Sequence, residues 1–393
     1  ESKDPKLAPL QAMMQGVELP TEEVKREKGK PVVFITGDST VKNEDKDENG
    51  MWGWGSQAYT VFDQNKITCV NCAKAGRSTR TFLNEGRWDK VYNSLQPGDY
   101  VLIQFGHNDI GPIDNQKQRG TIACAKDTSH VYKLADSGKY EVVYSFGWYL
   151  KKFIQDVREK GATPILVSLT PRNEWPGGKI ERRNDSYGKW YREVVKETGV
   201  ELVDVHNISA DFLDRIGREK AKAYYNHDHT HTSLTGAKMN AKSVAKGLMR
   251  NDSPLAKYLI SSTTIVEDMS KRDPKNNAPY YYSAELPDGN YKVTVVFGSK
   301  KKAGKTVVRA ENRRLMVDEV ATKKGEFKTV EFTVNKRTTF ISDLKYVKIK
   351  DREKNYPTWD DFLTLEFTGE APAVKELRIE RDTVATQIFL CGN

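Results

Sequence analysis

The sequence has few cysteines, few histidines and no long apolar run. Its 393 residues include four cysteines and six histidines. No apolar stretch approaches the roughly 20 residues that a helix needs to cross a bilayer, so we predict no membrane span. Cys69 and Cys72 form a Cys-x-x-Cys pair, but no second pair follows to complete a zinc site. We therefore expect buried thiols or a disulfide with Cys124, and the cysteines do not indicate a compartment.

A leader segment and a large excess of one charge are also missing. Residues 1–30 contain no apolar signal core and begin with Glu1, so we expect an N-terminal extension of a mature or trimmed chain. The net charge of +9 is mild. It fits ordinary solubility or attraction to an acidic polymer such as pectin. No nucleic-acid-binding motif accompanies this charge, so we do not expect nucleic acid as a partner.

A polar block follows the first buried-strand pattern of the chain. Residues 31–36 form an apolar run typical of a buried parallel strand, and residues 37–39, Gly-Asp-Ser, come directly after it. Ser39 is therefore expected just past the carboxyl end of a strand, where open α/β sheets hold their ligands. The order Gly-Asp-Ser differs from the Gly-x-Ser-x-Gly elbow of the α/β-hydrolases, which disfavours that fold. Alone, the block fits a polar turn equally well.

Two further predicted strands end in glycine-containing polar loops. The strand pattern at residues 67–70 precedes Gly76, whose backbone N–H can lie beside Ser39. The pattern at residues 100–105 precedes Asn108. An asparagine side chain can donate an N–H to an oxyanion, and glycine lets the backbone approach closely. We expect the three loops to meet at one edge of a sheet.

The last block, Asp-His-Thr-His, lies just before Ser233, which we predict to cap a helix over residues 234–249. His231 is close to neutral at pH 7, so it can take the proton of Ser39 and return it to a leaving group. Asp228 can hold the other ring nitrogen and stabilise the imidazolium. With the oxyanion donors, these residues supply the parts for acyl transfer through a covalent intermediate.

Two other interpretations of the last block are a capping turn and a metal site. The metal interpretation rests on three crowded histidines, which are His227, His229 and His231. Alternate positions in a loop seldom converge, and no carboxylate or thiolate set completes the coordination shell. We therefore predict neither a metal nor another cofactor.

Taken together, the blocks resemble those of the SGNH (GDSL-type) hydrolases, which are named for a Ser, a Gly, an Asn and a His in four such blocks. The longer matches resemble the rhamnogalacturonan acetylesterase branch, and they are Gly37–Val41, Asn71–Phe82, Phe105–Asp109 and Asp228–Thr232. The resemblance covers about residues 31–258. It implies the three-layer α/β fold of that superfamily, with a parallel sheet.

The resemblance also implies the roles of individual residues. Ser39 would be the nucleophile, His231 the base and Asp228 its partner. The N–H groups of Ser39 and Gly76 and the side chain of Asn108 would form the oxyanion hole. An excursion over residues 111–140 departs from the family pattern, so we expect the mouth of the site to differ from that of relatives.

Basic residues near the predicted crevice are candidates for contacts with substrate. Arginine can bind a carboxylate, such as that of galacturonate, through two parallel N–H bonds. The candidates are Arg77, His107 and Arg172. The alternative for the arginines is a structural ion pair, which we favour for Arg80.

Strand and helix patterns alternate up to about residue 259, which predicts a parallel sheet flanked by helices. Helices are expected at residues 144–160 and 184–198, and strands at residues 163–169 and 200–205. From about residue 261 short β-rich runs predict an antiparallel sandwich. These runs are residues 291–297, 306–309, 329–334, 346–349, 363–367 and 376–379.

We divide the chain into an esterase domain at residues 31–258 and a β-sandwich module at residues 262–386. The module loosely resembles jelly-roll accessory modules of carbohydrate-active enzymes. Its aromatic side chains can stack on sugars, although we favour core or interface packing for them. They are Tyr280, Tyr281, Tyr282, Tyr356 and Trp359. Residues 388–393 repeat the pattern of residues 34–38, so residues 387–393 are a candidate start of a second, truncated esterase-like domain.

These observations predict a serine esterase that removes O-acetyl groups from a pectic, rhamnogalacturonan-type or related plant polysaccharide or oligosaccharide. The residues themselves indicate ester chemistry, and the resemblance alone adds the acetyl group and a secreted or periplasmic location. Two alternatives are open. One is a lipase or thioesterase on the same fold, and the other is a carbohydrate-binding protein with a relic site.

Overall fold

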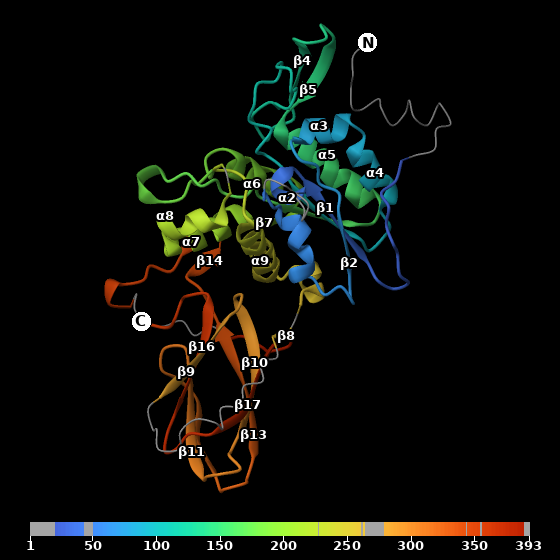
Figure 1. The fold of residues 1–393 in the computed structure, drawn as a ribbon. Coiled ribbons are helices and arrows are strands. Elements are labelled where there is room, and N and C mark those ends of the chain that lie inside the picture. Colours follow the sequence, from blue (N-terminus) through green and yellow to red (C-terminus); the bar gives the residue numbers. More distant parts are fainter. Residues whose placement is uncertain are drawn as a thin grey trace. The chain divides into compact units, whose positions relative to one another are not determined.

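The computed structural model describes residues 20–42, 50–226, 228–260, 262–263, 279–342, 344–353 and 356–388. It divides into two compact units, residues 1–260 and residues 261–393 (Figure 1). The candidate repeat of residues 34–38 near the C-terminus lies largely outside the described residues, as do residues 1–19 of the predicted extension.

The first unit is built around a five-stranded parallel sheet with the order β2-β1-β3-β6-β7. Its strands are β1 (Val32–Gly37), β2 (Thr68–Asn71), β3 (Tyr100–Gln104), β6 (Thr163–Val167) and β7 (Glu201–Val203). The sheet grows in one direction from β1 to β2 and in the other from β1 to β3. In open α/β sheets ligands bind at the carboxyl ends of the strands where this direction changes.

Helices cover both faces of the sheet, which gives three layers. Along β1, Val32 and Phe34 face one core, whereas Val33 and Ile35 face the other. Helices on the first face are α3 (Thr79–Asn84), α4 (Arg87–Ser94), α5 (Phe146–Glu159) and α6 (Tyr187–Thr198). Helices on the second are α2 (Ser39–Lys42), η1 (Trp54–Thr60), α7 (Val205–Ile216), α9 (Leu234–Arg250) and η4 (Pro254–Tyr258). Both faces of the central strands β1, β3 and β6 are buried, so most of their residues are apolar.

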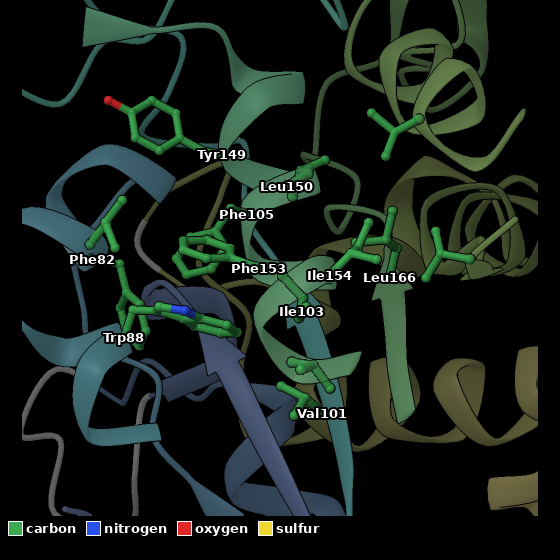
Figure 2. Close-up of a cluster of buried hydrophobic side chains, with 14 of the residues drawn as sticks. Phe82, Trp88, Val101, Ile103, Phe105, Tyr149, Leu150, Phe153, Ile154 and Leu166 are labelled. Carbon is green, nitrogen blue, oxygen red and sulfur yellow. The ribbon is translucent and has the colours of Figure 1, made fainter. Parts of the chain in front are cut away.

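Aromatic side chains fill the core on the first face (Figure 2). Trp88 of α4 packs on Phe153 of α5 with ring centroids 4.1 Å apart. The Trp88 indole N–H donates to Asp156 Oδ2 at 2.7 Å, so the buried ring has a hydrogen-bond partner. This packing holds α4 and α5 against the strands that carry the functional loops.

Most predicted elements of this unit are confirmed, with shifted ends. The helix predicted from residue 144 begins at Phe146, because Ser145 caps it and Tyr144 belongs to a strand. That strand, β5 (Tyr140–Tyr144), pairs with β4 (Ser129–Lys133) in a hairpin within the excursion. Sequence patterns did not indicate α3, α4 or α7. Short helices in loops are η2 (Pro176–Gly178), α8 (Arg218–Ala221) and η3 (Lys222–Tyr224).

The second unit is a β-sandwich of two four-stranded antiparallel sheets with the orders β13-β10-β17-β8 and β12-β11-β16-β9. The strands are β8 (Ser262–Thr263), β9 (Tyr280–Glu285), β10 (Gly289–Phe297), β11 (Gly304–Ala310), β12 (Arg314–Thr322), β13 (Lys328–Lys336), β16 (Phe362–Thr368) and β17 (Val374–Arg381). Outside these sheets lie β14 (Phe340–Ser342), β15 (Lys345–Tyr346) and η6 (Asp351–Glu353). The predicted strand at residues 346–349 is wrong, because β15 ends at Tyr346.

Two expectations about side chains need correction. Tyr281 and Tyr356 are 60% and 40% exposed, which contradicts the core alternative for these two side chains, whereas Tyr282 packs against the core. The disulfide with Cys124 is also wrong, since Cys69, Cys72 and Cys124 are free thiols. Burial raises the pKa of the Cys69 thiol to about 11. In the part of the chain that the structure describes, every helix is too short or too polar to cross a membrane.

Candidate active site

A tight turn places Ser39 just beyond the carboxyl end of β1. The buried Asp38 Oδ1 accepts hydrogen bonds from the backbone N–H and the Oγ1 of Thr40, both at 2.8 Å. A Cβ on Gly37 would lie 2.7 Å from the Gln104 carbonyl oxygen, so only glycine fits between β1 and β3. Burial raises the pKa of Asp38 to about 6, despite the hydrogen bonds from Thr40 that favour its ionised form. The serine thus leaves the sheet in one fixed direction.

His231 connects Ser39 with Asp228. Its Nε2 lies 2.9 Å from Ser39 Oγ, and its Nδ1 lies 2.6 Å from Asp228 Oδ2. Asp228 Oδ1 accepts the backbone N–H groups of Thr230 and His231, both at 2.7 Å. Partial burial opposes ionisation of Asp228, but the hydrogen bonds from His231 and Thr230 outweigh it and lower its pKa to about 2. This carboxylate is charged at neutral pH and can hold an imidazolium beside the serine.

The loop that carries His231 is tied down on both sides. Thr232 forms two hydrogen bonds with Trp52. The Trp52 N–H donates to the Thr232 carbonyl at 2.8 Å, and the Thr232 hydroxyl donates to the Trp52 carbonyl at 2.7 Å. Ser233 caps α9 by accepting the Gly236 N–H, as predicted. The Asn173 N–H donates to the His229 carbonyl at 2.7 Å. The register of His231 relative to Ser39 is therefore fixed by the backbone.

Gly76 and Asn108 follow β2 and β3, the two strands that flank β1. Asn108 Nδ2 donates to the Arg77 carbonyl oxygen at 3.1 Å, which joins the two loops. The buried Asp109 joins them again, because it accepts both the backbone N–H and the hydroxyl of Thr79. Burial raises the pKa of Asp109 to about 7. The structure therefore gathers the serine and the predicted oxyanion donors at one edge of the sheet.

Comparison with known proteins places the chain in a family. Residues 35–239 match the model of the GDSL-like lipase/acylhydrolase family. The chain belongs to this family. It is 30% identical to rhamnogalacturonan acetylesterase of Emericella nidulans over 217 residues, which cover 55% of this chain and 84% of that protein. It is 32% identical to rhamnogalacturonan acetylesterase RhgT of Bacillus subtilis over 248 residues, which cover 59% and 96%. The resemblance to the rhamnogalacturonan acetylesterase-like branch is confirmed.

As a GDSL-like acylhydrolase, the chain is a carboxylic ester hydrolase.

The family blocks also contain arginines, and the structure separates their roles. Arg80 is fully buried and binds Glu141 through Nε at 2.8 Å and Nη2 at 2.6 Å, which confirms the structural ion pair. Arg77 binds Glu85 at 2.9 Å and the Ala75 carbonyl at 3.0 Å. The Arg77 guanidinium is therefore already engaged and is not free to bind a substrate carboxylate.

Arg172, by contrast, has a guanidinium without a protein partner among the described residues. Its Nε is buried, and burial together with the charge of Arg183 lowers its pKa. The charges of Glu181, Glu174 and Asp228 act on the pKa of Arg172 in the opposite sense. The Arg172 charge also acts on Asp38, so a positive charge lies close enough to influence the carboxyl groups beside Ser39 and His231.

His107 lies in the same region. Its Nε2 is 3.2 Å from Thr170 Oγ1, and its Nδ1 is buried without a partner in the described structure. Burial first, and then the charge of Arg172, hold the pKa of His107 well below its usual range. The ring is therefore neutral at pH 7, and its unpartnered nitrogen lies inside the protein.

The metal interpretation of the last block has no geometric support. Both ring nitrogens of His231 are engaged by Ser39 and Asp228, while His229 Nδ1 lies 3.0 Å from Thr230 Oγ1. Over the described ranges, no three His, Cys, Asp or Glu side chains gather to hold a metal ion. His227 lies outside the described residues.

Sequence reasoning missed one residue of this site. Arg119, within the excursion, donates from Nη1 to Asn108 Oδ1 at 3.1 Å. It belongs to no recognised block, and only the folded path of the excursion brings it to Asn108. The one available signal was the excursion itself, which marked this side of the site as unusual.

Proposed function

We propose that this enzyme removes O-acetyl groups from carbohydrate, and that its substrates are pectic, rhamnogalacturonan-type polysaccharides or related plant polysaccharides. The observation that carries the proposal is the continuous hydrogen-bond chain from Ser39 Oγ through His231 to Asp228, with distances of 2.9 and 2.6 Å. Rhamnogalacturonan acetylesterases of Emericella nidulans and Bacillus subtilis are among the relatives of the chain, which supports the acetyl group and the carbohydrate class.

The geometry accommodates a two-step reaction. Ser39 Oγ attacks the acetyl carbonyl carbon while His231 Nε2 takes the hydroxyl proton. The tetrahedral oxyanion accepts N–H groups from Ser39, Gly76 and Asn108. The bond from this carbon to the sugar oxygen breaks, and the sugar oxygen takes the proton from His231. Water then attacks the acetyl-enzyme with His231 again as base, which releases acetate and restores the serine.

An acidic sugar polymer is supported by the charges near the triad. Arg172 offers an unpaired guanidinium, which can bind a galacturonate carboxylate through two parallel hydrogen bonds. A polymer of this kind would be met outside the cell, so the proposal includes a secreted or periplasmic location.

The decisive experiment measures acetate release from acetylated rhamnogalacturonan, homogalacturonan and xylan side by side, with Ser39→Ala as the blank. We expect release from the pectic substrates to exceed release from xylan. Equal or greater release from xylan would overturn the pectic assignment. A panel of short and long acyl esters and thioesters tests the lipase or thioesterase alternative. Glycan binding without turnover would support the relic-site alternative.

The role of Arg172 is tested by comparing two variants on two substrates. We expect Arg172→Gln to raise KM on acetylated pectin by roughly tenfold or more, because a hydrogen bond between charged groups is lost. On a small neutral aryl acetate its KM should not change. Arg77→Gln is the matched control, since Glu85 already binds that guanidinium. Equal losses on both substrates would assign Arg172 to the scaffold.

A further inference from the structure

Along the chain, Arg119 lies between β3 and the β4–β5 hairpin. Its guanidinium lies close to two of the proposed oxyanion donors, Asn108 and Gly76. Its Nη1 donates to Asn108 Oδ1 at 3.1 Å. Its Nη2 lies so close to Gly76 that a Cβ built on that glycine would stand 2.7 Å away. Within the described part of the chain, no carboxylate pairs with Arg119. This cation is therefore directed at a neutral amide rather than at an opposite charge.

The two contacts of the Asn108 side chain fix the orientation of its amide. Oδ1 accepts from Arg119, and Nδ2 donates to the Arg77 carbonyl at 3.1 Å. An amide turned by 180° would set its NH₂ against a guanidinium and its oxygen against a carbonyl oxygen. Since an amide nitrogen carries two N–H donors, the bond to the Arg77 carbonyl leaves the second one for the oxyanion. A donor bond from a cation to Oδ1 also polarises the amide, which strengthens its N–H as a donor.

The segment that carries Arg119 is anchored in the core by Arg80. From its buried position, Arg80 Nη1 donates to the carbonyl oxygens of Ile113 at 2.7 Å and Gly120 at 3.0 Å. The Thr121 N–H donates to the Asp109 carbonyl at 3.1 Å, one residue after Asn108. Both sides of the segment are thus bound to the loops of the site, and Arg119 is held in place by more than its own contacts.

We propose that Arg119 is a positioning residue of the oxyanion hole, which holds the Asn108 amide in the orientation that stabilises the transition state. The inference rests on the proposed function, because it concerns the same acyl transfer. It predicts an effect on kcat that passes through Asn108. It also gives the excursion at residues 111–140 a part in the chemistry, in addition to shaping the mouth of the site.

The test is a double-mutant cycle with 4-nitrophenyl acetate, a neutral ester that offers no carboxylate to an arginine. Removal of one oxyanion donor costs roughly 10²–10³-fold in kcat, so we expect about a tenfold loss in Arg119→Gln, where the donor is present but no longer held. KM should stay within about twofold of the wild-type value. In the Asn108→Ala background, the Arg119→Gln change should cost nothing further, because the group it positions is gone.

A second measurement separates positioning from a structural role. Added guanidinium should restore part of the kcat of Arg119→Ala, and it should restore none in the Arg119→Ala/Asn108→Ala double variant. Lys117→Gln is the matched control, because it removes a positive charge from an exposed position of the same segment and should leave kcat unchanged. Urea unfolding of every variant shows whether the fold is retained.

Three results would overturn the inference while leaving the proposed function intact. They are an unchanged kcat in Arg119→Gln, an equal loss with and without Asn108, and a loss confined to KM on acidic polysaccharide. Failure of the proposed function gives a different result. In that case the wild-type enzyme would not hydrolyse acetyl esters, and an organophosphorus reagent would not label Ser39.

Discussion

Replacing Asp228 by asparagine should damage catalysis more than replacing it by alanine, although asparagine is the closer mimic. The backbone N–H groups of Thr230 and His231 both donate to Asp228 Oδ1 at 2.7 Å. They would hold an asparagine with its oxygen on their side and its NH₂ toward His231 Nδ1. His231 would then accept at Nδ1 and carry its proton on Nε2, facing Ser39, so it could not act as a base.

The size of the effect follows from this tautomer. In serine triads an Asp→Asn change lowers kcat by roughly 10⁴-fold because the histidine is fixed in the wrong tautomer. Alanine at position 228 leaves Nδ1 free to bond to water and does not impose this tautomer, so we expect a smaller loss of kcat than asparagine causes. Stability should show the reverse order. Alanine loses the two backbone hydrogen bonds, worth about 1–3 kcal/mol together, whereas asparagine keeps them.

The assay is kcat on 4-nitrophenyl acetate together with urea unfolding, for wild type, Asp228→Asn and Asp228→Ala. The expected pattern is a crossover, with asparagine the slower enzyme and alanine the less stable one. If Asp228→Asn retained near-wild-type kcat, or if alanine were the slower of the two, the tautomer argument would be refuted.

Three further predictions concern the serine, the oxyanion loop and the buried carboxyl. Ser39→Ala and His231→Ala should each lower kcat by roughly 10³-fold or more in acetate-release assays with the unfolding midpoint retained, and substantial turnover in a pure sample would contradict the assignment. Gly76→Ala should abolish most activity, because a φ of +76° strains alanine and the added Cβ would collide with the Arg119 guanidinium. Gly199→Ala is the control: its φ is +64° and the space around it is open, so this variant should lose stability but not activity. Burial raises the folded-state pKa of Asp109 to about 7, so the folded state binds more protons than the unfolded state between that value and about 4. Urea midpoints should therefore fall as pH rises through this window, and Asp109→Asn should flatten the profile.

The loops after β1 and β3 could be predicted because both strands are buried on both faces. Val32 to Ile35 alternate between two cores, so all four residues are apolar and the change to polar residues at the end of β1 is clear in the sequence. The chemistry of the last block was also local, since the Asp228 carboxylate binds backbone and ring atoms no more than three residues away.

What could not be predicted depends on contacts between distant residues. The sequence alone does not distinguish the surroundings of Arg77 from those of Arg172. In the structure Glu85 binds the Arg77 guanidinium, whereas no described residue forms a hydrogen bond or ion pair with the Arg172 guanidinium. Tyr144 joins a strand because Ser129 pairs with it, which its own helical pattern does not indicate. No spacing rule connects Arg119 to Asn108, because the irregular loop of residues 109–118 folds back between them.

The buried Arg80–Glu141 pair links the segment at the mouth of the site to helix α3. Removing one partner of a buried ion pair typically costs about 3–5 kcal/mol, a large part of the stability of a domain. A change in the segment that separates Arg80 from Glu141 would therefore destabilise the fold. Its effect on substrate range would matter only in a chain that still folds. Grafts that exchange the segment between relatives should carry both residues together, or replace both with an apolar pair.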